Sequence, residues 1–438
     1  MKHSRPFSSY ARSNLLIFSV TRFISELGSS VFKFALSLYI LDVTGSAAIF
    51  SMVLGLSILP GVLVNIFAGV LVDRSDKRKL LVVTELLCGV AAMAFLPIFL
   101  LDPTNVQFLA AFSVALSLVQ SLTFLTLNAS IPNLVERENV NRVNSSYQSI
   151  GAIINVVGPM LGAIAYRVLG LEMILTLNVF TYILAGLLQM RLKFRESTED
   201  QRSPGYFDSL KDVFAYIRGQ TAIKYLLGIF VAINFILVPL IQVILPYVTY
   251  RVMHVSPTQL SVIQGAWSVG VIAGAFLISW QKIHHFIVNK NKIFILIQLQ
   301  AVLFIAWCFP QLLPSMQGHM WQITSVYVLI LAATGLFNSM GNIPMTSYVQ
   351  LYTPENIRAG IFGVSSSMIM LATPLGIWFY GILSELIHWV VLTIFSGIVV
   401  LVIGMAAYKN KQLREFFNRW GTPVLDPAGD KGRATASS

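Results

Sequence analysis

The chain has 438 residues, of which 56% are hydrophobic and 11% are charged, and its formal net charge is +11. Globular domains carry about 25% charged residues, so this sequence has too little polar surface to cover a soluble protein of its size. It is also too apolar to be disordered. Its 30 basic residues are spread thinly, which argues against nucleic-acid binding. The composition is that of a polytopic membrane protein.

A membrane-spanning helix needs about 20 predominantly apolar residues. In chain order this criterion predicts spans at 14–41, 47–71, 80–101, 107–128, 145–168 and 172–191. After a polar stretch it predicts six more, at 223–248, 259–280, 292–313, 321–345, 360–384 and 388–408. A faint internal repeat accompanies them, because Pro159 in the fifth span and Pro374 in the eleventh are both closely followed by Leu-Gly. We therefore expect an all-α membrane protein with twelve transmembrane helices in two pseudo-symmetric six-helix bundles.

The longest polar stretch divides the chain in two. We expect an N-terminal bundle over 1–192, a cytoplasmic central loop over 193–222, a C-terminal bundle over 223–408 and a cytoplasmic tail over 409–438. Two apolar series at helical spacing indicate helices on the membrane surface, with a solvated linker as the alternative. They are Phe207, Leu210, Val213, Phe214 and Ile217 in the loop, and, more weakly, Leu413, Phe416, Phe417 and Trp420 in the tail.

The positive charge indicates the orientation of the chain. With both termini inside, nearly all basic residues fall on the inner face. The outer loops keep only Arg167 and Arg251, while Arg22 and Lys33 fall within a span. We expect the +11 charge to be chiefly an orientation signal, with some affinity for anionic membrane lipids.

The first span carries a polar stripe at three- and four-residue steps, formed by Arg22, Ser25, Glu26, Ser29, Lys33 and Ser37. Buried charge is costly, so the stripe must face water or partners inside the bundle, and we infer that it lines the transport pathway. Glu26 is the best candidate for a proton-coupling group, paired with Arg22 and Lys33. The alternative is a structural ion pair, with Lys33 reaching outward. Glu85, Glu172 and Glu385 lie near span ends and are expected to face water.

Uncharged polar groups also occur within spans. They predict an amide- and aromatic-lined pocket for an amphiphilic molecule, although each could instead make an interhelical hydrogen bond. These residues are Gln120, Asn128, Asn178, Tyr182, Asn234, Gln242, Gln264, Trp267, Asn338 and Trp378. The two cysteines, Cys88 and Cys308, lie far apart and offer neither a disulfide nor a metal site, and we expect no cofactor.

The inner loop after the second span combines a glycine, an acid and several bases. These residues are Gly69, Asp73, Arg74, Lys77 and Arg78, and charge pairs on such a turn can form and break as two halves rock; the alternative is that the bases only anchor topology. The loop resembles the signature G-x-x-x-D-R-x-G-R-[KR] of the major facilitator superfamily, with Asp76 at the second glycine. The resemblance implies a gating loop.

The fifth span carries Gly151, Gly158, Pro159 and Gly162. This series resembles the fifth-helix motif G-P-x-x-G-G of drug:proton antiporters in the same superfamily, with Ala163 in place of the last glycine. The alternative is a kink that only serves packing.

Residues 14–408 as a whole resemble the bacterial drug-exporter branch that includes macrolide efflux proteins, most clearly at 24–28 and 38–47. The resemblance implies alternating access and export driven by the proton gradient, in the bacterial inner membrane. We expect a proton-coupled exporter of hydrophobic or amphiphilic small molecules, with protons and membrane lipids as partners and a monomeric state. Two cations against one acid in the stripe favour an anionic or zwitterionic cargo over a dication.

Other functions are weaker expectations. The same kind of exporter could carry a specific siderophore, natural product or lipid. A membrane-embedded enzyme is the least favoured, because the sequence has no H-E-x-x-H, no G-x-S-x-G and no paired intramembrane acids. An ATP-driven pump is disfavoured by the missing G-x-x-x-x-G-K-[ST] loop.

Overall fold

The computed structural model describes residues 9–68, 72, 75–135, 140–194, 215–288, 292–312, 319–353 and 355–418. The first half contains α1 (Ser9–Thr44), α2 (Ala47–Phe67), α4 (Lys77–Leu101), α5 (Val106–Leu134) and α6 (Val140–Gln189). The second half contains α8 (Thr221–Pro239), η2 (Leu240–Ile244), η3 (Tyr247–Val252), α9 (Pro257–Ser279), α10 (Gln281–Val288), α11 (Ile293–Ala306), α12 (Phe309–Leu312), α13 (Met320–Tyr352), α14 (Glu355–Leu386), α15 (Trp389–Lys409) and α16 (Lys411–Asn418).

These elements make twelve spans, which confirms the prediction. Ten helices of the described chain are long and apolar enough to cross a membrane, and a shorter apolar helix covers Ala47–Val62. The twelfth comes from α6, whose helical course is broken at Gly170 with φ 73° and ψ 170°. A side chain disfavours this left-handed backbone, and glycine allows the chain to reverse there without a longer loop. The predicted fifth and sixth spans are therefore the two arms of α6.

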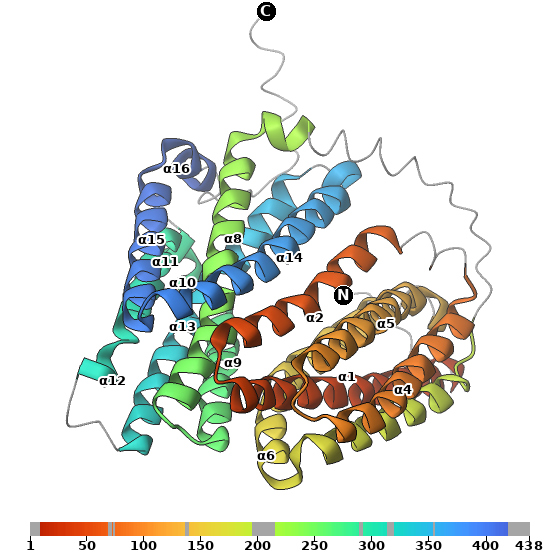
Figure 1. The fold of residues 1–438 in the computed structure, drawn as a ribbon. Helices are drawn as coiled ribbons and strands as arrows, with labels where there is room; N and C mark the ends of the chain where they lie inside the picture. The colour runs from red at the N-terminus through yellow and green to blue at the C-terminus, as the bar shows by residue number, and fades with distance from the viewer. Residues whose placement is uncertain are drawn as a thin grey trace, which may run out of the picture.

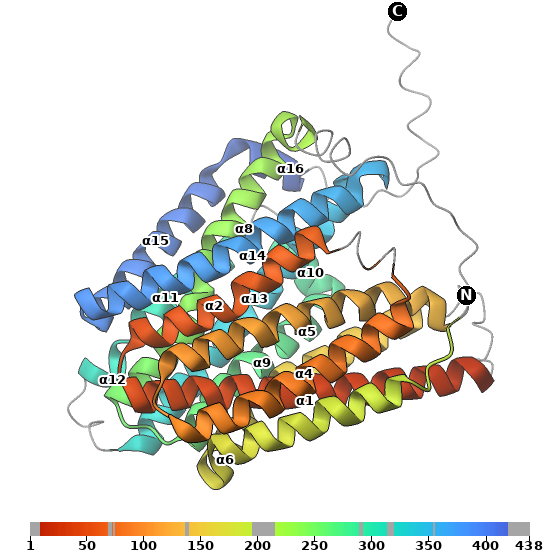
Figure 2. The same cartoon turned by 45° about the vertical axis from the view of Figure 1, so that its right-hand side comes forward.

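The helix pairings repeat between the halves, as two pseudo-symmetric bundles require. In the first half α1 packs on the first arm of α6, α2 on α5, and α4 on α6; in the second half α8 packs on α14, α9 on α13, and α11 on α15. Counted as spans, each pair in the second half stands six positions after its equivalent. The bundles meet through α2 with α14 and through α6 with α9, and Figures 1 and 2 show α2 and α14 running side by side.

Side-chain caps define several helix starts. The Ser46 hydroxyl accepts the Ile49 N–H at 3.1 Å, and Asn105 caps α5 in the same way. Ser256 and Gln259 form a reciprocal capping box at α9. Each cap satisfies N–H groups that a helix leaves unpaired at its first turn.

The C-terminal helix α16 packs against protein, which refines the expectation of a surface helix in the tail. Leu413 and Phe417 are buried, and the Phe417 ring meets the Phe294 ring of α11 edge-on with centroids 5.6 Å apart. Most of the corresponding helix expected in the central loop lies outside the described residues, as do Trp420 and the end of the tail.

Candidate functional site

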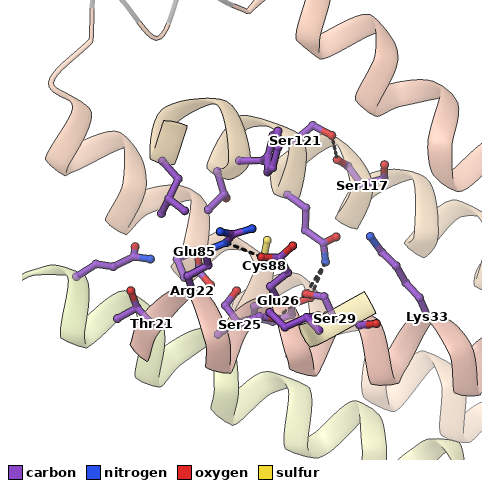
Figure 3. A pocket seen from close by; sticks show the side chains of 18 of the residues that line it. Thr21, Arg22, Ser25, Glu26, Ser29, Lys33, Glu85, Cys88, Ser117 and Ser121 are labelled. Carbon is purple, nitrogen blue, oxygen red and sulfur yellow. Dashed lines mark hydrogen bonds and ion pairs between the residues drawn. The ribbon is translucent and has the colours of Figure 1, made fainter. Parts of the chain in front are cut away.

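A cavity of about 420 Å³ lies in the first bundle and reaches the second. The polar stripe of α1 lines it from Thr21 to Lys33, α4, α5 and both arms of α6 supply the other N-terminal walls, and Met370 of α14 closes one side. Figure 3 shows the labelled α1 side chains turned toward the same space as Glu85 and Cys88 of α4. The predicted stripe therefore faces the bundle interior.

Arg22 is the most tightly held charge in the cavity. Its Nε donates to the Glu26 carboxylate at 2.7 Å, one turn along α1. A second guanidinium nitrogen donates to the backbone carbonyl of Tyr147, and the guanidinium carbon stands 3.2 Å from the centre of the Tyr147 ring. Arg22 is buried, whereas the Glu26 side chain is 38% exposed. The guanidinium fork and its ability to stack explain why arginine suits this position.

A neutral hydrogen-bond network continues the stripe. The Tyr182 hydroxyl bonds with the Ser29 hydroxyl at 2.9 Å and accepts the Gln120 amide at 2.6 Å. Asn178 donates to the same hydroxyl at 3.4 Å. Gln120, Asn178 and Tyr182, three of the predicted pocket residues, are thus brought together. Asn128, a fourth, donates to the Tyr147 hydroxyl at 3.1 Å.

The expectation that Glu85 faces bulk water is wrong. Glu85 lies two turns into α4, is 1% exposed and lines the cavity. It interacts with the side chains of Ser25 and Gln189, and its Oε1 has no hydrogen-bond partner among the described residues. The prediction placed Glu85 near a span end, whereas α4 begins at Lys77, so the carboxyl lies deeper in the bundle. Glu172 and Glu385 are exposed, as expected.

Lys33 has an exposed side chain in the middle of α1 and lines the 420 Å³ cavity. It also lines a smaller space of about 80 Å³ together with Gln120. A cation in the middle of a span requires water or a partner, and the cavity is where this side chain meets that requirement. The alternative of Lys33 reaching outward from the bundle is not what the structure shows.

The second bundle holds a cavity of about 210 Å³ that is lined by amides and apolar side chains. Four predicted pocket residues meet there: Asn234, Gln242, Trp267 and Asn338. Gln300 and Asn342 join them and were missed, although a glutamine inside the apolar run of α11 is itself a signal. None of the described residues that line this cavity is charged.

Four predicted pocket residues line neither of these two cavities. They are Asn128 and Asn178, which bond to tyrosines of α6, and Gln264 and Trp378. Gln264 is half-buried on α9 and lines neither cavity. Trp378 of α14 lies at the seam between the bundles, where its indole N–H donates to the Met52 carbonyl of α2 at 3.3 Å.

The glycines of the fifth span let α6 approach α1. A Cβ at Gly158 would overlap the Ser30 side chain, one at Gly162 would lie 2.9 Å from the Val31 carbonyl oxygen, and one at Gly151 would lie 2.9 Å from an Arg22 nitrogen. Pro159 lies within this helix. The series therefore lets α6 pack closely against α1, beside the polar stripe.

The predicted gating loop is described only in part, because Gly69, Asp73 and Arg74 lie outside the described residues. Lys77 donates to Asn133 at 3.3 Å, and Arg78 donates to the Met190 carbonyl. Asp76 accepts the N–H groups of Arg78 and Lys79 at 3.0 and 3.1 Å. The aspartate that replaces the signature glycine is thus the N-cap of α4, with an ordinary φ of −63°.

Polar contacts join the bundles at the end of the molecule that holds the 44–46 turn. Asp42 at the end of α1 accepts the Tyr250 hydroxyl of the second bundle at 2.7 Å, and the Tyr166 hydroxyl of its own bundle at 2.6 Å. Ser46 donates to Glu385 of the second bundle. These contacts hold that end closed.

Tyr250→Phe is expected to loosen this closed end, because it removes the hydrogen bond between the bundles and keeps the ring. A hydrogen bond to a charged group contributes about 1.5–3 kcal/mol, and exposure lowers that figure here. The expected result is an increase of roughly threefold or more in the labelling rate of a Met370→Cys cavity thiol from the side of the 44–46 turn. Tyr166→Phe is the matched control, since it removes a bond to the same carboxylate within one bundle. Equal labelling rates in the two variants would contradict the assignment.

Two pseudo-symmetric six-helix bundles, with a charged cavity in the first that reaches the second, are the architecture of a membrane transporter. The family model described as Major Facilitator Superfamily matches residues 18–329. The chain belongs to the major facilitator superfamily. That membership makes it a transporter rather than an enzyme, as the sequence predicts.

Known proteins similar to this chain include bacterial efflux proteins. It is 22% identical to Macrolide efflux protein A of Streptococcus pyogenes over 398 residues, covering 90% of this chain and 94% of that protein. It is 22% identical to Multidrug efflux pump Tap of Mycobacterium tuberculosis over 403 residues, covering 90% and 92%. Among solved structures, a bacterial homologue of the iron transporter ferroportin in an inward-facing state superposes with a TM-score of 0.69 at 15% identity, covering 92% of this chain and 100% of that one.

Proposed function

We propose that this protein is a secondary active exporter that exchanges hydrophobic or amphiphilic small molecules for protons by alternating access. The observation that carries the proposal is the cavity of the first bundle that reaches Met370 of the second, with Arg22, Glu26 and Lys33 on one continuous helix face. Within it, Glu26 is the proposed proton-coupling group. Its carboxylate is half-exposed to the cavity and bonded to Arg22, so proton gain would break that pair. The names of the similar efflux proteins support export of drugs such as macrolides.

The two cavities suggest how an amphiphile binds. The first bundle offers charges, and the second offers the amides of Asn234, Gln242, Gln300 and Asn338 beside Trp267. A molecule with an ionisable group and a neutral, oxygen-rich body could place one part against each bundle. The lining of the second cavity is neutral and rich in amides, so it would recognise carbonyl and hydroxyl groups of the substrate.

The sidedness is part of the same proposal. The distribution of basic residues supports a bacterial cell membrane protein whose two termini are cytoplasmic. On that orientation the contacts of Asp42 and Ser46 close the outer end, and the cavity opens inward. We propose that the bundles, 1–192 and 223–408, rock as units, that residues 193–222 and 409–438 lie on the inner side near anionic lipid, and that the protein is a monomer.

Proton flux in proteoliposomes tests the exchange. Addition of a macrolide or a monocationic amphiphile to the wild-type protein should drive protons across the membrane in the direction opposite to the substrate. Glu26→Gln should lower this substrate-dependent proton flux at least tenfold. Glu172→Gln is the matched control, because Glu172 is exposed just after the Gly170 break, at the start of the second arm of α6. Absence of flux in the wild type would disprove antiport, and full flux in Glu26→Gln would disprove the role of Glu26 alone.

A further inference from the structure

Two buried acceptor oxygens lie on interacting side chains in the lining of the charged cavity. Glu85 of α4 and Gln189 at the end of α6 are each 1% exposed, both line the cavity, and their side chains interact. Within the described part of the chain, neither Glu85 Oε1 nor Gln189 Oε1 has a hydrogen-bond partner. An unpartnered buried oxygen costs about 1–3 kcal/mol, and more when the group is charged. These two oxygens therefore lack a donor among the described residues.

A single proton on Glu85 supplies that donor. An ionised carboxylate only accepts hydrogen bonds, whereas a carboxylic acid has one O–H and keeps an acceptor oxygen. The O–H can donate to Gln189 Oε1, while the other oxygen accepts the hydroxyl of Ser25, which interacts with Glu85. Both buried oxygens would then be satisfied.

No cation near Glu85 in the described structure is placed to pair with its ionised carboxylate in place of a bound proton. On α1, Arg22 is engaged by Glu26 and the Tyr147 carbonyl, and Lys33 extends into the open cavity two turns beyond Ser25. The other titratable groups beside Glu85 are Cys88 on its own helix and Tyr182 on α6, and neither is a cation. The described residues of α5 contribute no titratable group. The local surroundings thus favour the neutral acid.

We propose that Glu85 carries a proton in this conformation, held between Ser25 and Gln189, and that it is a second proton site of the transport cycle. The proposal rests on the proposed exchange. On release the Glu85 O–H bond breaks, its electron pair stays on the carboxylate, and the proton passes to water in the cavity. Entry of a monovalent cationic substrate at that moment leaves the net charge of the cavity unchanged. With Glu85 counted, the cavity has two acids beside its two cations, which removes the earlier preference for an anionic cargo.

Infrared difference spectroscopy of the purified full chain tests the proton directly and needs no transport. The C=O band of a protonated carboxylic acid should be present at pH 7, although a glutamate in water, with a pKa of about 4.3, is ionised there. Glu85→Gln should remove the band, Gln189→Leu should shift its frequency, and Glu26→Gln should leave it in place. A wild-type spectrum without the band, or a band that survives Glu85→Gln, would overturn the proposal.

Substrate-induced proton release separates this proposal from the function it rests on. In detergent, a macrolide added to the wild type should release protons, and Glu85→Gln should lower the yield at least twofold while binding persists. Glu85→Gln keeps the shape of the neutral acid and is expected to fold as well as the wild type. If the band is present but no substrate releases protons, the exchange proposal fails and the protonated Glu85 stands. If release in Glu85→Gln equals that of the wild type, Glu85 is not part of the coupling.

Discussion

Gly270→Val is expected to prevent the second bundle from folding. Gly270 lies where α9 crosses α13, and a Cβ there would overlap the backbone carbonyl oxygen of Ala332 and stand 2.8 Å from its carbon. Two further glycines repeat the contact, since Gly274 meets the Leu336 carbonyl and Gly335 meets the Trp267 carbonyl. Overpacking typically costs about 1–3 kcal/mol. A clash between two helix backbones exceeds that range, because neither can move as a flexible side chain does.

The measurement is the yield of monodisperse protein after extraction, followed by thermal unfolding of whatever survives. Gly228→Val is the matched control, because Gly228 lies in α8 of the same bundle and a Cβ there has nothing within 4 Å. We expect at least a tenfold lower yield for Gly270→Val than for Gly228→Val. Similar yields and melting temperatures would show that α9 and α13 do not need this close approach.

Arg22→Gln is expected to abolish transport and also to destabilise the first bundle. The substitution leaves Glu26 without its cation and the Tyr147 carbonyl without its donor. Breaking a fully buried pair costs about 3–5 kcal/mol, and the cost here is lower, about 1–3 kcal/mol, because the Glu26 side chain is 38% exposed. Substrate-dependent proton flux should fall by roughly a hundredfold, since the Glu26 carboxylate loses the cation that it is bonded to in the cavity.

Arg22→Lys separates charge from geometry. Lysine restores the cation but has no planar fork to bond Glu26 and Tyr147 while stacking on the ring. We expect partial recovery of stability and less recovery of flux. Arg167→Gln, an exposed arginine at the far end of the first arm of α6, is the control for loss of a positive charge. Wild-type flux in Arg22→Gln would place Arg22 outside the coupling machinery.

Much of the architecture is predictable from hydropathy alone, because each span must bury its backbone and expose apolar side chains to lipid. The break at Gly170, where α6 reverses direction, also lies between two spans that hydropathy separates. The polar stripe of α1 is predictable for the same reason, since charges that recur on one face of a span must point inward. Its residues from Arg22 to Lys33 line the cavity, whereas the proton-coupling role of Glu26 stays a proposal.

Glu85 shows where such reasoning stops. How deeply Glu85 is buried depends on where α4 begins and on which helices pack over it, and the packing is set by tertiary structure that hydropathy does not report. One local signal was present: Glu85 shares a helix face with Cys88, Gly89 and Ala92, all small and buried. Such a face is where another helix approaches closely, so an acid on it is a candidate for burial. Gln300 of α11 is 3% exposed, but its helix face carries the large side chains of Leu296, Ile297 and Phe304, so this signal does not find it.

The unequal chemistry of the two bundles has an electrical consequence. The charged residues of the 420 Å³ cavity all belong to the first bundle, and the described lining of the amide cavity is neutral. A membrane potential acts on charge at about 2.3 kcal/mol per elementary charge for 100 mV. Rocking the second bundle therefore moves none of these charges across the field, whereas displacement of the first bundle does. Voltage sensitivity should reside in one half of a molecule whose frame is nearly symmetric.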